Sequence, residues 1–126
     1  MADYQLIVIG AGPGGYEAAL RAAKLGKRVA VVERREAGGT CLNRGCIPTK
    51  TLLHASAIYR DAKNGAYCGI HTEDIHADMA EIFAYKRAVS QKLSAGIESL
   101  FKSAKIDLLR GTALITAPGA VRVTDA

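Results

Sequence analysis

The chain has 126 residues, of which 49% are hydrophobic and 23% are charged. This size allows one domain with a modest core, and the composition is not that of a disordered protein. The formal charge of +5 suits an anionic ligand, but the lysines and arginines form no basic run, which argues against nucleic-acid binding. No stretch approaches the roughly 20 apolar residues that span a bilayer, and the first residues resemble neither a signal nor a transit peptide. We therefore expect a cytoplasmic protein with no nucleic-acid or membrane partner.

The N-terminal part of the chain predicts a strand, a helix and a second strand. Residues 5–9 (QLIVI) form a short apolar run that ends at Gly10, which is typical of a buried parallel strand. Apolar residues then recur at helical spacing over residues 14–25, and Gly26 is placed to stop the helix. Residues 28–33 (RVAVVE) predict another buried strand. A right-handed crossover would make the two strands parallel.

A long excursion is expected to follow this unit. Residues 34–45 predict a polar, glycine-rich loop, and Pro48 fits the first turn of a helix that runs toward Lys63. Residues 66–77 show no clear period. Asp78 has the spacing of a capping box and predicts the start of a second, longer helix. Its apolar face is expected to contain Met79, Ile82, Phe83, Val89, Leu93, Ile97 and Leu100.

Short strands are predicted at residues 106–109, 114–116 and 121–123, with a hairpin turn at Pro118-Gly119. The predicted fold class is therefore α/β, with a Rossmann-like βαβ unit, a parallel sheet, a long helical excursion and a C-terminal β-hairpin. The sequence pattern indicates only two strands that must be parallel. The sheet is therefore expected to be incomplete compared with a full doubly wound fold.

Gly10, Gly12 and Gly15 have the spacing G-x-G-x-x-G between the first predicted strand and helix. In dinucleotide-binding folds the first glycine permits a tight turn, the second lets the backbone approach a pyrophosphate, and the third allows close helix–strand packing. Glu33 ends the next strand, where its carboxylate can accept a hydrogen bond from a ribose hydroxyl. We predict a pyrophosphate at residues 12–15 and a ribose at Glu33. The alternative is a tight turn without a ligand, and the motif alone does not distinguish FAD from NAD.

Cys41 and Cys46 have a C-x-x-x-x-C spacing near the start of a predicted helix. A helix N-terminus and the nearby charges of Arg44 and Lys50 would stabilise a thiolate, which favours a redox-active pair. One alternative is a zinc site that recruits Cys68 and a histidine, and another is a pair of inert buried cysteines. We predict no metal site and expect Cys68 to be a small core residue.

Residues 38–50 (GGTCLNRGCIPTK) closely resemble the active-site segment of the class I pyridine nucleotide-disulfide oxidoreductases. Together with residues 10–15 and 111–113, the resemblance covers essentially the whole chain. It implies FAD as cofactor, with Cys41 exchanging with a dithiol substrate and Cys46 facing the flavin as the second catalytic thiol. The cofactor-binding residues that it implies are Gly10, Gly12, Pro13, Gly14, Gly15, Glu33, Arg34, Gly39, Thr40, Cys41, Cys46, Lys50, Gly111, Thr112 and Ala113.

Within that family, residues 41–43 and 48–50 resemble lipoamide dehydrogenases. These enzymes pass electrons from dihydrolipoamide to FAD and then to NAD, and the resemblance implies that the dihydrolipoamide is carried on a lipoyl domain. A glutathione- or mercuric-reductase-like member and a non-catalytic FAD-binding fragment remain alternatives. Arg44 stands where many members have valine, and we expect it to add a charge beside the dithiol pocket.

Complete family members are several times longer and form homodimers. The resemblance implies that residues 1–126 are the N-terminal segment of the FAD-binding domain, and that the NAD and dimerisation domains are absent from them. We therefore expect this segment alone to lack full activity.

Overall fold

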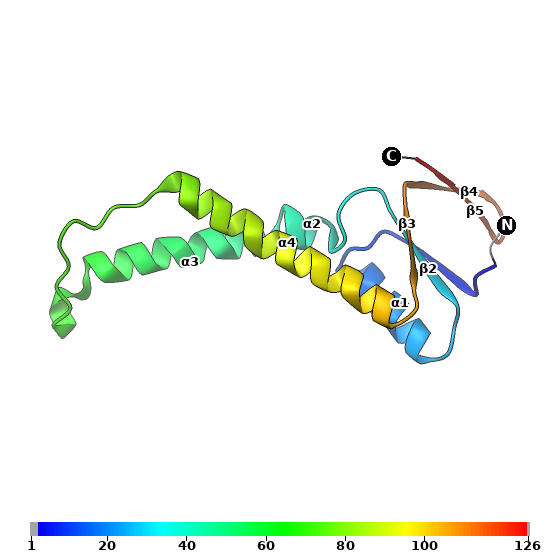
Figure 1. Cartoon of the computed structure of the whole chain (residues 1–126), viewed down its shortest axis with the longest axis horizontal. Coiled ribbons are helices and arrows are strands. Elements are labelled where there is room, and N and C mark those ends of the chain that lie inside the picture. Colours follow the sequence, from blue (N-terminus) through cyan, green and yellow to red (C-terminus); the bar gives the residue numbers. More distant parts are fainter. Residues whose placement is uncertain (1–2, 126) are drawn as a thin grey trace.

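A computed structural model describes residues 3–125. These residues form a small α/β unit from which a pair of long helices extends as an arm (Figure 1). The predicted fold class is confirmed, since a parallel sheet, a long helical excursion and a C-terminal hairpin follow one another in the expected order.

The predicted strand–helix–strand unit is present as β1 (Leu6–Ile9), α1 (Pro13–Lys24) and β2 (Val29–Glu33). β1 pairs with β2 in parallel. β3 (Asp107–Arg110) pairs in parallel with the other edge of β2, so that the strand order is β1-β2-β3. The sequence pattern predicted only two strands as parallel. β3 pairs with β2 only after the whole helical excursion, and a local sequence pattern contains no information about such distant pairing.

The core lies on one face of this sheet, under α1 and the C-terminal part of α4 (Met79–Ser103). The central strand β2 is buried along residues 29–32, as expected for a strand with neighbours on both edges. Phe101 of α4 is 1% exposed and packs into the same cluster as Ala19 of α1 and Val31 of β2. Burial of such a side chain contributes roughly 1.5–3 kcal/mol. The core therefore joins α1 and β2, near the N-terminus, to the C-terminal part of α4.

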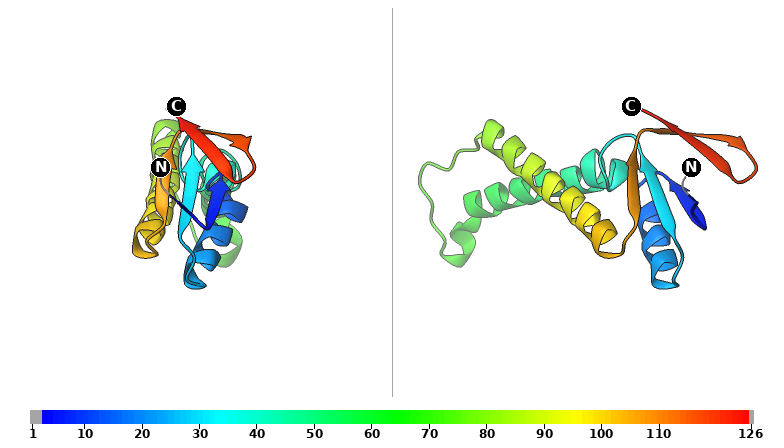
Figure 2. Two further views of the ribbon diagram at one scale, coloured as in Figure 1. Left: turned by 90° about the vertical axis from the view of Figure 1, so that its right-hand side faces the viewer. Right: turned by 45° about the vertical axis from the view of Figure 1, so that its right-hand side comes forward.

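The excursion between β2 and β3 contains α2 (Gly39–Asn43), α3 (Cys46–Lys63), a short 3-10 helix η1 (Gly65–Cys68) and α4. α3 and α4 pack against each other and carry η1 and its connection to the far end of the arm (Figures 1 and 2). The prediction of a loop over residues 34–45 was therefore wrong at α2, because five residues are too few for helical periodicity to be visible.

The start of α4 is confirmed. Oδ1 of Asp78 accepts hydrogen bonds from the backbone N–H groups of Ala80 at 2.8 Å and Glu81 at 3.0 Å. These bonds satisfy N–H groups that have no partner within the helix.

The predicted apolar face of α4 was only partly correct. Ile97 is buried as expected, but Met79 and Leu100 are 56% and 49% exposed, and the buried stripe instead includes Ser90 and Ser94. Oγ of Ser94 donates to the backbone carbonyl of Ala37 at 2.7 Å, so a hydrogen bond replaces apolar contact at this position. A hydrophobicity pattern does not register small polar residues that become buried against a neighbouring loop.

The chain ends in the predicted hairpin, formed by the antiparallel strands β4 (Thr112–Ala117) and β5 (Ala120–Thr124). Gly119 has a positive φ of 74°, which suits the turn between them. The hairpin projects from the sheet on the side away from the helical arm (Figure 2). Within residues 3–125, no helix has both the length and the apolar character needed to cross a membrane.

Candidate functional site

The turn between β1 and α1 requires glycine for two different reasons. Gly10 has a φ of 99°, a conformation that residues with a side chain rarely adopt. A Cβ at Gly15 would lie 1.9 Å from the carbonyl oxygen of Gly10, so α1 packs too closely on the strand end for any side chain there. These are the roles that a dinucleotide-binding turn gives to its first and third glycines.

The start of α1 is open to an anion. Gly12 is the N-cap residue and has no side chain with which to cap the helix, and Pro13 at the first position has no N–H. A Cβ at Gly12 would approach only the Cα of Gly39, at 4.0 Å. Uncapped N–H groups and the positive end of the helix dipole favour a phosphate at this position.

A second glycine turn packs against the first. Gly39 has a φ of 60°, and a Cβ there would lie 2.8 Å from the Cα of Gly12. The backbone N–H of Gly38 donates to the carbonyl of Ala11 at 2.8 Å. The segment that begins α2 is therefore fixed beside the start of α1, at the distance that only glycine permits.

Glu33 ends β2 with its carboxylate held in place. Its Oε2 accepts from the backbone N–H of Ala11 at 2.8 Å, and its Oε1 accepts from that of Arg35 at 2.8 Å. Each carboxylate oxygen can accept more than one hydrogen bond. The carboxylate is therefore oriented by the backbone while acceptor capacity remains for hydroxyl groups of a ligand.

A cavity of about 350 Å³ opens beside Glu33. The sequence-predicted residues among those lining it are Gly10, Glu33, Arg34, Gly39, Thr40, Gly111, Thr112 and Ala113. The structure thus brings residues from the start, the middle and the end of the chain to one place. The remaining lining residues, which were not predicted, are Ile9, Val32, Arg35, Glu36 and Arg44. Ile9 and Val32 directly precede Gly10 and Glu33, and Arg35 and Glu36 follow Glu33 within three residues, which is the signal that could have found these four.

Arg44 and Glu36 form an ion pair in the wall of this cavity. Nη2 of Arg44 lies 3.0 Å and 2.7 Å from the two carboxylate oxygens of Glu36. This hydrogen bond from Arg44 lowers the pKa of Glu36 below its ordinary value. Arg44 was expected to add a charge beside the dithiol pocket. The structure adds that this charge is paired with Glu36 and that both side chains line the cavity beside Glu33.

The two predicted redox thiols lie on separate helices that meet at a sharp turn. Cys41 is half-buried in α2 and packs against the core, whereas Cys46 is exposed and is the first residue of α3. Nδ2 of Asn43 donates to the carbonyls of Ala37 and Gly39, both at 3.0 Å, which fixes α2 on its own loop. The pair thus sits on a well-braced segment, outside the residues that line the cavity.

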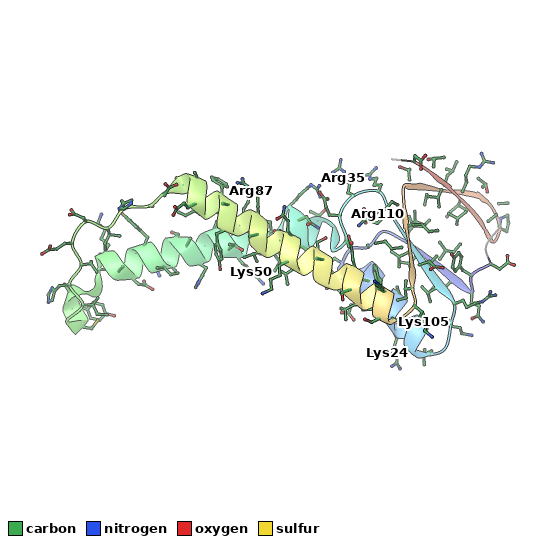
Figure 3. The ribbon with its side chains drawn as sticks, in the orientation of Figure 1. Lys24, Arg35, Lys50, Arg87, Lys105 and Arg110 are labelled. Atoms are coloured by element: carbon green, nitrogen blue, oxygen red, sulfur yellow. The ribbon has the colours of Figure 1, made fainter. Side chains whose placement is uncertain are left out.

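The thiols interact with each other more strongly than with nearby cations. A hydrogen bond with Cys46 raises the pKa of the Cys41 thiol, aided by desolvation and by charge on Cys46, while the ammonium of Lys50 acts in the opposite direction. The sequence had predicted that helix start and cations would ease deprotonation. For Cys41 this was wrong, because the neighbouring thiol and desolvation raise its pKa more than the ammonium of Lys50 lowers it. Lys50 lies on α3 where it crosses α4, whereas Arg35 and Arg110 lie at the end of the sheet (Figure 3).

Cys68 is exposed in η1, so the prediction of a core position was wrong. Its Sγ donates to the carbonyl of Gly65 at 3.2 Å, and η1 lies at the far end of the arm from α2 (Figure 1). Among residues 3–125, no group of three or more His, Cys, Asp or Glu residues is arranged to hold a metal ion. The described residues therefore do not form the zinc site that was weighed as an alternative.

Comparison with known proteins agrees with this geometry. The family model described as pyridine nucleotide-disulphide oxidoreductase matches residues 4–125. The dihydrolipoyl dehydrogenases of Chlorobaculum parvum and Geobacillus stearothermophilus are 45% and 44% identical to the chain over 123 residues, which are 98% of this chain and 26% of each relative.

Among solved structures, the Cu(II) complex of the HOCl-induced flavoprotein disulfide reductase RclA from Escherichia coli matches with a TM-score of 0.80 and 31% identity. That match covers 98% of this chain and 25% of the reductase chain. The chain thus spans about a quarter of the length of these relatives. Since the family model covers nearly every described residue, the chain belongs to the pyridine nucleotide-disulphide oxidoreductase family.

Proposed function

We propose that this chain is the FAD-binding and disulfide-bearing segment of a dihydrolipoyl dehydrogenase. One observation carries the proposal: the cavity beside the oriented carboxylate of Glu33 is lined both by Gly10, in the turn before α1, and by residues 111–113, and the thiol pair lies on the segment that begins at its wall residues Gly39 and Thr40. The identity of about 45% to dihydrolipoyl dehydrogenases favours this member of the family over a glutathione- or mercuric-reductase-like one.

The residues present fit the adenosine diphosphate half of FAD. N–H groups at residues 12–15 would bind the pyrophosphate, Glu33 would accept from ribose hydroxyls, and residues 111–113 would contact the adenine. A cavity of about 350 Å³ is near the lower end of the range for small-molecule sites, which suits this half of the cofactor. When bound, FAD would supply a two-electron acceptor for the reduced thiols.

The thiol pair would carry the first step of dihydrolipoamide oxidation. In the oxidised state Cys41 and Cys46 share a disulfide. A substrate thiolate attacks Sγ of Cys41, the bond to Cys46 breaks, and Cys46 leaves as a thiolate. The second substrate thiol loses its proton and attacks the mixed disulfide, which closes the lipoyl disulfide and releases Cys41. The substrate has then lost two electrons and the cysteine pair has gained them.

The effect of one thiol on the other supports this division of roles. The interaction with Cys46 raises the pKa of Cys41, so Cys41 holds its proton more firmly than an ordinary cysteine. Cys46 begins α3, where the helix dipole favours an anion. Cys46 would therefore be the sulfur that faces the electron acceptor, and Cys41 the one that exchanges with the substrate.

The activity of the whole protein needs more than these residues. We propose that NAD binding and homodimer formation use segments that the relatives have outside the matched quarter, and that the dithiol is presented on a lipoyl domain in the cytoplasm. A non-catalytic FAD-binding role is the alternative for residues 1–126 taken alone. The chain supplied with FAD, dihydrolipoamide and NAD is accordingly expected to form NADH far more slowly than an intact enzyme.

The proposal is tested by titrating the reduced, purified chain with FAD and recording absorbance and flavin fluorescence. We expect saturable binding with a perturbed flavin spectrum. Binding that is absent at high FAD concentration, while circular dichroism shows a folded chain, would contradict the proposal.

A further inference from the structure

The ion pair between Arg44 and Glu36 has no role in the function described so far. Both side chains are about half exposed, 43% and 51%, and such pairs contribute little to folding stability. Both nevertheless line the cavity beside Glu33. The ion pair is therefore placed to affect ligand binding in the cavity more than the stability of the fold.

Glu36 is a fixed partner for Arg44. Just before it, the N–H of Arg35 donates to Glu33 at 2.8 Å, and the carbonyl of Arg35 accepts from the guanidinium of Arg110, which also pairs with Glu98. The segment that carries Glu36 is thus tied to β2, β3 and α4.

Arg44 is held at its backbone as well. Its N–H donates to the carbonyl of Thr40 at 2.8 Å, and Thr40 follows Gly39, whose backbone packs on Gly12 at the start of α1. The backbone of Arg44 is therefore anchored to the turn that packs on the start of α1, where the helix dipole favours a phosphate. Its ion pair engages Nη2, and a guanidinium has further N–H donors in the same plane.

We propose that Arg44 is an additional phosphate-binding residue of the adenosine diphosphate site, and that Glu36 positions it. This inference rests on the proposed FAD site but names a contact that the glycine turn does not supply. A carboxylate that fixes one edge of a guanidinium leaves the other donors oriented for a phosphate oxygen. Glu36 acts through Arg44 and does not touch the ligand.

The experiment measures the affinity of the full 126-residue chain for ADP and for adenosine by isothermal titration calorimetry, with FAD binding measured in parallel. Arg44→Gln should weaken ADP binding about three- to tenfold, as expected for a charged hydrogen bond at a half-exposed site. It should leave adenosine binding unchanged, because adenosine has no phosphate. Loss of stability would weaken both ligands equally, so the comparison separates a phosphate contact from a structural role.

Arg60→Gln is the matched control, since Arg60 is also ion-paired, to Asp61 at 3.2 Å, but lies on the arm and not in the cavity. Glu36→Gln should weaken ADP binding in the wild-type background and cause no further loss in the Arg44→Gln background. Arg44→Lys, which keeps the charge but not the planar fork, should retain part of the affinity.

The outcomes separate the two claims. Equal ADP affinity of the wild type and the Arg44→Gln variant would overturn this inference and leave the FAD site standing. An equal loss of adenosine and ADP binding would also overturn it. A folded wild-type chain that binds neither FAD nor ADP would overturn the proposed function, and this inference with it.

Discussion

The carbonyl oxygen of Gly10 occupies the space that a side chain at Gly15 would need, 1.9 Å from the position of its Cβ. The ideal Cβ would also lie 3.3 Å from Cγ1 of Val8. The third glycine of the motif is thus required by the packing of α1 on β1, before any ligand is considered.

Gly15→Ala should therefore destabilise the chain by at least about 2 kcal/mol, as overpacking of a rigid contact typically does. Urea unfolding followed by circular dichroism measures this. Gly14→Ala is the matched control, because a Cβ there has no atom within 4 Å and alanine is the better helix former by about 0.5–1 kcal/mol. Equal stability of the two variants would show that α1 can move away from the strand.

In contrast to Gly15→Ala, Gly12→Ala should reduce the stability of the chain only slightly and reduce its affinity for FAD strongly. Its Cβ would make only an ordinary contact, 4.0 Å from the Cα of Gly39, and alanine at an N-cap costs less than about 1 kcal/mol relative to glycine. The same methyl group would stand where the backbone must approach the pyrophosphate. We expect an affinity loss of about tenfold or more by flavin fluorescence. Unchanged affinity would place the pyrophosphate elsewhere.

Much of the site could be predicted from the sequence because its parts are local. The glycines of the turn lie within six positions of one another, and one carboxylate oxygen of Glu33 accepts from Arg35, two residues further on. The start of α4 at Asp78, in the fold outside the site, is local in the same way. Gly111, near the C-terminal end of the chain, was predicted only through resemblance to a family, because the residues next to it in the sequence do not indicate that it lines the cavity.

The failures have a common physical origin in long-range contact. Ser94 is buried because its hydroxyl reaches a loop carbonyl at Ala37, 2.7 Å away, and the charge of Arg44 is paired because the fold brings Glu36 near it. β3 joins the sheet only after the excursion has closed. Patterns of hydrophobicity and charge along the sequence contain none of these partners.

Oxidation should join Cys41 to Cys46 and leave Cys68 free. Cys46 is near enough to Cys41 to raise its pKa, whereas Cys68 lies in η1 at the end of the arm (Figure 1). Thiol titration of the unfolded, mildly oxidised chain should give a count that rises by two on reduction. Cys68→Ser should show the same rise, and Cys41→Ser should abolish it. A disulfide that survives in Cys41→Ser as a covalent dimer would instead indicate pairing between chains through exposed sulfurs.

The raised pKa of Cys41 makes a further prediction about its reactivity. Since its pKa is raised by Cys46, less thiolate is present at a given pH than for an ordinary cysteine, and alkylation should be slow because the thiolate is the nucleophile. Replacing Cys46 by alanine removes both the hydrogen bond and the neighbouring charge, so the pKa of Cys41 should fall.

The alkylation profile of Cys41 with iodoacetamide should therefore shift to lower pH in Cys46→Ala, with a faster rate at every pH below the original midpoint. Both chains would carry Cys68→Ser, and mass spectrometry of the peptide containing Cys41 would follow the reaction. Lys50→Gln should move the profile the other way, since the ammonium of Lys50 lowers the pKa of Cys41. If the profile stays in place when Cys46 is removed, Cys46 does not raise the pKa of Cys41, and burial alone would then have to account for the slow reaction of Cys41.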